Sequence, residues 1–368
     1  MRKIFSDYCP LIRPGKVGFK ALVASIMFAA ALSAFAAPAH LPPAASLKEL
    51  EPQVEQSVAR GLAWLARSQR DDGSFEDGSW GNNLTAVIAL AGKAFLVYGV
   101  TPKHPQYGVN VERCADFLLA HQQPDGLFWC EGAHSFKGGA FMYSHALSTV
   151  FIAELSGMTD THQQSRIDAA LAKATALILS AQNEAGGWRY APVPPVVADL
   201  SVSAWCLMAL RISRLNGAAV PAEAIDRAMN YVRSHARADG FFGYSGAHDP
   251  APAMTAAGIA CLCLGGMADD PILPVSGRVL LAGFGTAGDL GMISMGATIP
   301  GMPEYRRYCG ALAMHALGTQ FWEIYRLRHY PNVMRGQAAD GRWGSPYTTA
   351  INLLVLGLSL EQSPSYQR

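Results

Sequence analysis

Apolar positions along most of the chain fall into two kinds of helical segment. Segments of the first kind are amphipathic. In the first of them Val58, Leu62 and Leu65 share one face, while Arg60 and Arg67 lie elsewhere. Segments of the second kind are apolar nearly all round, which predicts helices that are buried on every side. These apolar segments are Thr85–Val97, Ala146–Leu155, Val202–Ile212, Met254–Leu264 and Ala350–Leu360.

A short polar turn separates the two kinds of segment five times. Each turn starts at Gln or a polar stand-in and runs through Asp-Gly or Gly-Gly to an aromatic residue. We expect Gly to supply the positive φ that reverses the chain, Gln to bond exposed main chain, and the aromatic to pack over the neighbouring pair. The turn acids are therefore interpreted as structural. The five turns are Gln69–Phe75, Gln122–Phe128, Gln182–Trp188, His235–Phe241 and Gln337–Trp343.

The spacing of the turns indicates repeated helix pairs. Successive turns start 53, 60 and 53 residues apart, and the last step is 102 residues, which leaves room for one degenerate repeat around Leu273–Leu317. Helices that are apolar all round need cover on every side, and a closed ring provides it. The predicted fold is all-α, an α/α toroid of about six helix pairs over residues 55–361, after a linker at 37–54 and before a tail at 362–368.

The first 36 residues follow a different pattern. A lead with five basic residues precedes the apolar run Ala21–Leu32, and Ala34-Phe35-Ala36 has the small-x-small form of a signal peptidase site. Extended to Ala36 the run has 16 residues, fewer than the roughly 20 of a membrane span. We expect a cleaved signal peptide, cut after Ala36, rather than a retained anchor. The mature chain is then exported, periplasmic or secreted, and has no transmembrane span.

Charge, cysteine content and residue spacing argue against several classes of partner and cofactor. Residues 1–36 hold five of the 29 basic and one of the 28 acidic residues, so the mature chain has a net charge of −3. It lacks a basic stripe, which argues against a nucleic-acid partner. Its six cysteines fall mostly in apolar segments and are expected as core thiols, although export permits a disulfide at Cys130. Metal-ligand spacings are lacking, so we expect neither metal nor cofactor.

The turns resemble the Gln-Trp repeats of squalene and hopene cyclases and the related repeats of protein prenyltransferase β-subunits, over about residues 55–361. Further strings resemble exported bacterial proteins that carry prenyltransferase/squalene-oxidase repeats. The resemblance implies an α/α toroid with a central apolar cavity suited to an isoprenoid chain. The strings are Met142–Ala146, Gly186–Tyr190, Asp199–Val202 and Pro252–Ala256.

The chemistry of these families carries over less well than their scaffold. Hopene-type cyclases protonate an alkene with the middle Asp of Asp-x-Asp-Asp, and the matching string here, Asp199–Val202, has Ser201 at that place. A serine hydroxyl is too weak an acid for this step. Protein prenyltransferases bind zinc through Asp-x-Cys and a later His, but the chain's one Asp-x-Cys, Asp7–Cys9, lies in the signal peptide. The Gly-Cys-Gly-Glu-Gln of complement-type toroids is absent.

Candidate site residues lie where the apolar helices begin. In a toroid these helix starts converge on one mouth of the cavity, and their dipoles favour an anionic group there. Asp199 and His145 form the predicted catalytic pair. The structural alternatives are an N-cap for Asp199 and a hydrogen-bonded core histidine for His145. The predicted ligand-binding residues are Tyr143, Ser201, Trp205, Thr255 and Tyr308.

Three functions remain open from the sequence. The leading hypothesis is an exported repeat protein whose cavity binds an apolar, isoprenoid or lipid-like ligand without turning it over. The second is a terpenoid cyclase-type enzyme that uses a non-standard acid, and the third is a periplasmic glycan-active α/α toroid. Cavity geometry discriminates between them: Asp199 and His145 in hydrogen-bond reach at a closed apolar pocket favour the enzyme. The sequence predicts neither the ligand nor the oligomeric state.

Overall fold

The computed structural model describes residues 46–76, 84–130, 141–283 and 303–360. The predicted signal peptide, the first part of the linker and the C-terminal tail lie outside these ranges. Within them, every helix is too short or too polar to cross a membrane. The helices are α2 (Leu47–Ser68), α3 (Leu84–Val97), α4 (Gly108–Ala120), α5 (Phe141–Leu155), α6 (Thr161–Ser180), α7 (Leu200–Leu215), α8 (Ala222–Ser234), α9 (Pro252–Leu264), α10 (Ile272–Gly283), α11 (Pro303–Ala316), α12 (Thr319–Arg335), α13 (Pro346–Gly357) and the 3₁₀ helix η1 (Leu358–Leu360).

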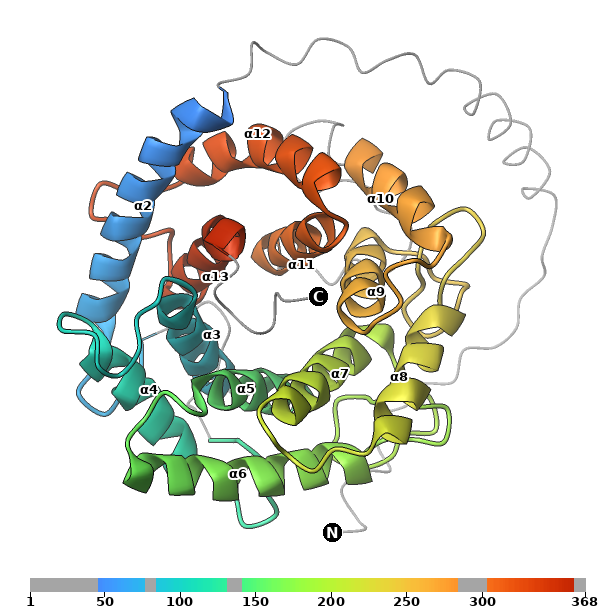
Figure 1. Ribbon diagram of the computed structural model, residues 1–368, viewed down its shortest axis with the longest axis horizontal. Helices are drawn as coiled ribbons and strands as arrows, with labels where there is room; N and C mark the ends of the chain where they lie inside the picture. Colours follow the sequence, from blue (N-terminus) through green and yellow to red (C-terminus); the bar gives the residue numbers. More distant parts are fainter. Residues whose placement is uncertain (1–45, 77–83, 131–140, 284–302, 361–368) are drawn as a thin grey trace, which may run out of the picture. The chain divides into compact units, whose positions relative to one another are not determined.

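The helices form two concentric rings, with the even-numbered helices outside and the odd-numbered helices inside (Figure 1). Each inner helix contacts the next in chain order, and α13 contacts α3, so the inner ring is closed. In the outer ring α12 contacts α2. The predicted all-α toroid of six helix pairs is therefore confirmed. The degenerate repeat is the fifth helix pair in chain order, α10 and α11.

Burial separates the two rings as the apolar pattern predicted. Every residue of α9 from Met254 to Leu264 is buried, and in α5 all but Phe141 and Tyr143 are buried. The outer helix α8 buries one face only, through Ala224, Ala228, Met229, Tyr231 and Val232. The inner helices thus have neighbours on every side, whereas the outer helices separate them from solvent.

A glutamine in four of the turns links one repeat to the next. Its side-chain Nε2 donates to the carbonyl of its own turn glycine and to a carbonyl of the following outer helix, at 2.8 to 3.3 Å. The last of these bonds closes the ring, because it joins the turn after α12 to α2. The donors and their acceptors in the next helix are Gln69 to Asn110, Gln122 to Ala170, Gln182 to Ala224, and Gln337 to Ser57.

The turn glycines fix how closely the repeats approach. Gly73, Gly126, Gly186 and Gly341 have φ between +87° and +101°, a region that favours glycine. A Cβ at any of them would lie 2.3 to 2.5 Å from a main-chain oxygen of the next outer helix. The turn acids are structural, as predicted: Asp72, Asp125, Asp239 and Asp340 each accept a hydrogen bond from the N–H two residues on.

A polar side chain in the inner helix satisfies the buried N–H of the turn aromatic. Phe128 N–H donates to His145 Nδ1 at 3.1 Å, and His145 Nε2 lies 3.1 Å from the Ala174 carbonyl. The histidine is thus the neutral tautomer with its proton on Nε2. The equivalent bonds are Trp188 to Ser203 (2.9 Å), Phe242 to Thr255 (3.1 Å) and Trp343 to Thr349 (3.0 Å).

These bonds give two predicted site residues a structural role. Both ring nitrogens of His145 bond main chain, which fits the structural alternative of a hydrogen-bonded core histidine, and its catalytic role stays a prediction. Thr255 Oγ1 bonds both Phe242 N–H and the Ala251 carbonyl. The Thr255 hydroxyl thus makes structural hydrogen bonds with both its donor and an acceptor lone pair. Both side chains are fully buried, where unpaired main-chain groups are costly.

Two predicted boundaries also shift. The fourth turn runs one residue later than predicted: Gly240 holds the positive φ, and Ala236 and Phe242 stand where other turns have Gln and the aromatic. The adjacent phenylalanines, Phe241 and Phe242, made the register ambiguous. The toroid also starts earlier than residue 55, because α2 begins at Leu47, after a Ser46 N–H to Glu49 bond of 2.8 Å.

The described cysteines agree with the interpretation as core thiols. Cys114, Cys130, Cys206, Cys261, Cys263 and Cys309 are all buried, and no disulfide joins any of these six. Burial raises the pKa of the Cys114, Cys261 and Cys309 thiols to about 12. Such thiols are inert as nucleophiles near neutral pH.

Replacing the ring-closing glutamine should weaken the whole ring. Gln337→Ala removes two bonds of 2.8 Å, to Ser57 and Gly341, and the 2.6 Å bond from Arg60. We expect the free energy of unfolding, measured in urea, to fall by about 2 kcal/mol. Gln53→Ala is the control, because exposed Gln53 bonds only Glu49 of its own helix, and it should change stability by less than about 0.5 kcal/mol. Equal losses in the two variants would refute the closing role.

The buried histidine should make stability depend on pH. Burial lowers the pKa of His145 to about 4, whereas an unfolded histidine titrates near about 6.5. Between these values the unfolded chain binds the extra proton, so stability should be lost as pH falls from about 6.5 toward 4. Urea midpoints at pH 7 and pH 5 should differ less in His145→Gln than in the wild type. Exposed His162→Gln should keep the wild-type difference, and a matching change there would contradict this assignment.

Candidate functional site

Five of the seven predicted site residues gather near the N-terminal ends of α5, α7 and α11. Asp199 caps α7, and Ser201 and Trp205 follow it on the first turns of that helix. Tyr143 stands near the start of α5, and Tyr308 near the start of α11. His145 and Thr255 serve the turns instead, as described above. The convergence predicted for the inner-helix starts is thus present in three helices, whose side chains meet across the ring through Tyr143, Trp205 and Tyr305.

Asp199 is fully buried, and only one of its carboxylate oxygens is satisfied. Oδ1 accepts from the Ser201 hydroxyl at 2.6 Å and from Val202 N–H at 3.0 Å. Oδ2 has no hydrogen-bond partner among the residues the structure describes. Burial raises the pKa of the Asp199 carboxyl, and Ser201, the Val202 N–H, the charge of Arg189 and Tyr244 oppose that shift only in part. The residue is therefore an N-cap, and also a carboxyl biased toward its protonated form.

Two tyrosines that the sequence did not single out complete the surroundings of Asp199. The hydroxyls of Tyr190 and Tyr244 lie 2.6 Å apart, and the negative charge of Asp199 raises the pKa of both, after the larger effect of burial. Main-chain bonds place them: Tyr190 O accepts from Met142 N–H, and Tyr244 O from Leu200 N–H. Both follow a turn aromatic by two residues, which is the sequence signal that identifies them.

Trp205, Tyr305 and Tyr143 form a second hydrogen-bonded group, the tyrosine group, beside the group of Asp199, Tyr190 and Tyr244. The Trp205 indole N–H donates to the Tyr305 hydroxyl at 2.8 Å, and the Tyr305 and Tyr143 hydroxyls are 3.1 Å apart. The Tyr143 and Tyr190 rings stack at 6.3 Å, which connects the two groups. Burial raises the pKa of both Tyr143 and Tyr305 well above the ordinary range. These phenols stay protonated and act as hydrogen-bond donors.

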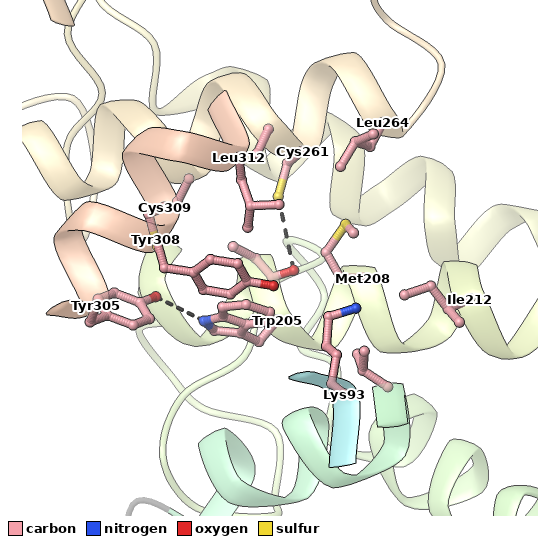
Figure 2. A pocket seen from close by; sticks show the side chains of 14 residues that line it. Lys93, Trp205, Met208, Ile212, Cys261, Leu264, Tyr305, Tyr308, Cys309 and Leu312 are labelled. Carbon is pink, nitrogen blue, oxygen red and sulfur yellow. Dashed lines mark hydrogen bonds between the residues drawn. The ribbon is translucent and has the colours of Figure 1, made fainter. Parts of the chain in front are cut away.

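The centre of the inner ring holds a small apolar cavity of about 30 Å³ (Figure 2). Space of this size holds about two water molecules. The stacked rings of Trp205 and Tyr308, 6.1 Å apart, form one wall. Five inner helices contribute the lining, which is Lys93, Val150, Ala204, Trp205, Met208, Ile212, Ala257, Ala260, Cys261, Leu264, Tyr305, Tyr308, Cys309 and Leu312.

The cavity and the Asp199 carboxyl are neighbours but not the same site. Trp205 and Tyr305 line the cavity and also belong to the tyrosine group, whereas Asp199 is not among the lining residues. The predicted pairing of Asp199 with His145 is not formed, because each has other partners. The arrangement offers an aromatic and apolar surface for a ligand, with a buried acid one layer behind it.

A buried ion pair at the cavity is the feature that sequence reasoning missed. Lys93 Nζ on α3 lies 2.6 Å from Glu154 Oε1 on α5, and both side chains are at most 3% exposed. Burial lowers the pKa of Lys93, and the negative charge of Glu154 opposes that shift. A lysine and a glutamate inside otherwise apolar runs, 61 residues apart, were the available signal. In the described part of the chain, no three acidic, histidine or cysteine side chains are grouped to hold a metal ion.

Known proteins share this architecture. Structures of the type II terpene cyclase MstE from Scytonema contain the product merosterolic acid A or the substrate geranylgeranyl dihydroxybenzoate. Their TM-scores are 0.56 and 0.54, with 16% identity, over 84% of this chain and 98% of theirs. A β-1,3-1,4-glucanase from Paenibacillus sp. X4 has a TM-score of 0.60 with 10% identity, over 85% of this chain and 93% of that one. At these identities the likeness is one of fold.

Sequence comparison is more specific. Lanosterol synthase of Homo sapiens is 34% identical over 92 residues, which are 25% of this chain and 12% of that protein. The matched part is therefore a small fraction of that relative's length. The model of the prenyltransferase alpha-alpha toroid domain matches residues 43–193 and, in an overlapping second match, residues 130–278. These two matches span well over half of the chain, which therefore belongs to the prenyltransferase alpha-alpha toroid domain family.

Proposed function

We propose that this protein binds an apolar, isoprenoid- or lipid-like ligand in the cavity of its inner ring. The observation that supports this most is the lining: five inner helices present alkyl groups and the faces of Trp205 and Tyr308 to one small cavity. Apolar pockets with few polar groups are typical of sites for small apolar ligands. The fold is that of a terpene cyclase solved with prenylated molecules, which supports the same ligand class here.

The ligand has to displace side chains. A prenyl chain is far larger than the 30 Å³ of the cavity, so binding needs rotation of long, unbranched or γ-branched side chains. Met208, Leu264 and Leu312 line the space and have that freedom. Binding by this route exchanges side-chain contacts for ligand contacts of the same apolar kind. The proposal therefore predicts a flexible wall rather than a preformed tunnel.

We further propose that the protein is exported and acts in this role outside the cytoplasm. The support is the N-terminal sequence: a basic lead, the apolar run Ala21–Leu32 and the small-x-small site ending at Ala36. The intact mass of protein recovered from a bacterial periplasm tests this proposal. A mature chain that begins at Ala37 supports it, and a mass that still includes residues 1–36 refutes it.

The ligand proposal is tested on the same preparation. Native mass spectrometry should show wild-type protein with bound farnesol, and Ala260→Leu should bind it roughly tenfold more weakly, because the added side chain fills the cavity. Ala172→Leu is the matched control, since Ala172 is exposed on the outer helix α6, and its farnesol affinity should equal that of the wild type. Thermal unfolding by circular dichroism checks that both variants fold. Equal binding by all three proteins would refute a central site.

One observation favours a second candidate, a cyclase-type enzyme with Asp199 as its acid. The carboxyl is buried, its Oδ2 lacks a partner among the described residues, and its pKa is raised by burial. A carboxylic acid, even with a raised pKa, is a far stronger proton donor than the Ser201 hydroxyl. In this reading the aromatic faces of Trp205 and Tyr305 would stabilise a cationic intermediate. The ligand-binding proposal does not require this chemistry.

The enzyme reading predicts products that depend on Asp199. Incubation with squalene or geranylgeranyl dihydroxybenzoate should give cyclised products with the wild type, and Asp199→Asn should lower the yield by roughly a hundredfold or more. Asp160→Asn is the matched control, because Asp160 caps the outer helix α6 in the same way. It should retain full activity. Absence of products from the wild type, analysed by gas or liquid chromatography, would exclude this candidate for these substrates.

A further inference from the structure

The Lys93–Glu154 pair places an amine in the wall of the central cavity. Lys93 lines the cavity, while Glu154 lies behind it on α5, with Nζ and Oε1 2.6 Å apart. Figure 2 shows the lysine side chain extending from α3 into the space lined by Trp205 and Met208. Among the described residues of the lining, Lys93 alone carries an amine. The remaining lining groups are alkyl, aromatic, phenol and thiol.

Stability alone does not account for this pair. Taking two charges out of water costs several kcal/mol each, and a buried ion pair is commonly no more stable than apolar residues of similar volume. The neighbouring positions on α3 and α5, such as Ala94 and Ala153, are apolar and fully buried. An apolar pair would thus suit the ring at least as well. The pair at the cavity therefore points to recognition of a ligand.

The charge state of the pair selects the chemistry of that ligand. A carboxylate or phosphate would add a second anion beside Glu154, in a cavity with almost no other polar groups, and leave a net charge there. A neutral electrophile adds no charge. Lysines that are desolvated in apolar pockets form Schiff bases with carbonyl compounds. Burial lowers the pKa of Lys93, which favours the free amine that this reaction needs. Glu154 would then serve as counter-ion to the cationic product.

We propose that Lys93 binds an apolar aldehyde covalently, as a protonated imine paired with Glu154. This inference rests on the proposed function, because the apolar chain of the aldehyde occupies the central cavity. Glu154 takes a proton from the Lys93 ammonium, and the free amine attacks the carbonyl carbon to give a carbinolamine. That intermediate loses its oxygen as water, using the proton held by Glu154 and one from nitrogen. In sum, R–NH₃⁺ and R′–CHO give R–NH⁺=CH–R′ and water, without any oxidant or reductant.

Reductive trapping tests the imine. Wild-type protein is incubated with farnesal and sodium cyanoborohydride, digested, and mapped by mass spectrometry. The adduct should form on Lys93 roughly tenfold faster than on exposed Lys48, Lys103 or Lys173. Glyceraldehyde, a small polar aldehyde, serves as the control and should label the exposed lysines instead. Farnesal adducts spread over the exposed lysines, with none at Lys93, would overturn the proposal.

Variants separate the roles of the two side chains. Glu154→Gln keeps the size but removes the charge, and trapping at Lys93 should slow roughly a hundredfold. The double variant Lys93→Met/Glu154→Leu replaces the whole pair by apolar groups, so it should fold, bind farnesol and lose the adduct. Lys173→Arg, on the exposed face of α6, should trap at Lys93 at the wild-type rate. Unchanged trapping in Glu154→Gln would overturn the counter-ion role.

Farnesol binding distinguishes this inference from the function on which it rests. If farnesol binds and farnesal is not trapped at Lys93, the cavity holds apolar ligands without covalent chemistry and the imine is refuted. If neither compound binds, the proposed function itself fails. Trapping at Lys93 that excess farnesol suppresses is the expected result, because both molecules then compete for one cavity.

Discussion

The double hydrogen bond of the turn glutamine is the interaction on which the ring depends. In four of the turns, one glutamine amide nitrogen bonds both its own turn and the outer helix that follows, which holds that repeat in register with the next. The glycine in the same turn permits the approach, since a Cβ there would collide with the neighbouring main chain. Gln337 makes the same pair of bonds, one to Gly341 of its own turn and one to Ser57, 280 positions earlier in the chain, which turns a stack of repeats into a closed ring.

Closing the ring buries main-chain N–H groups, and polar side chains of the inner helices accept hydrogen bonds from them. Once the ring is closed, the main chain of each turn aromatic is buried and its N–H needs an acceptor inside the protein. Ser203, Thr255, Thr349 and His145 supply it in four repeats. Buried polar residues in this fold are therefore weak indicators of catalysis. What distinguishes a functional group is a polar atom that the repeat pattern does not use, as with Asp199 Oδ2 and the Lys93 amine.

The sequence predicted the architecture and only part of the site. Periodic turns and runs that are apolar all round sufficed for the six helix pairs and for the order of the two rings. Two interpretations of His145 stayed open in the sequence, because a histidine in an apolar helix gives the same pattern whether it bonds main chain or transfers protons. Its partners, the Phe128 N–H and the Ala174 carbonyl, become visible only in the structure. Lys93 and Glu154 escaped notice because their pairing joins positions on two helices, and a single sequence does not show which helix faces align.

Asp199 and the Lys93–Glu154 pair divide the centre of the ring into regions of different chemistry. Asp199 lies among tyrosines whose hydroxyls hydrogen-bond one another, so that region is polar and supplies O–H donors although it is buried. The cavity beyond Trp205 and Tyr305 is apolar, and its one charged wall residue is already neutralised by Glu154. A ligand that extends through both regions needs an apolar chain with a polar end. In the proposed function, the aromatic layer that both regions share would orient such a molecule, because only one of its ends suits each side.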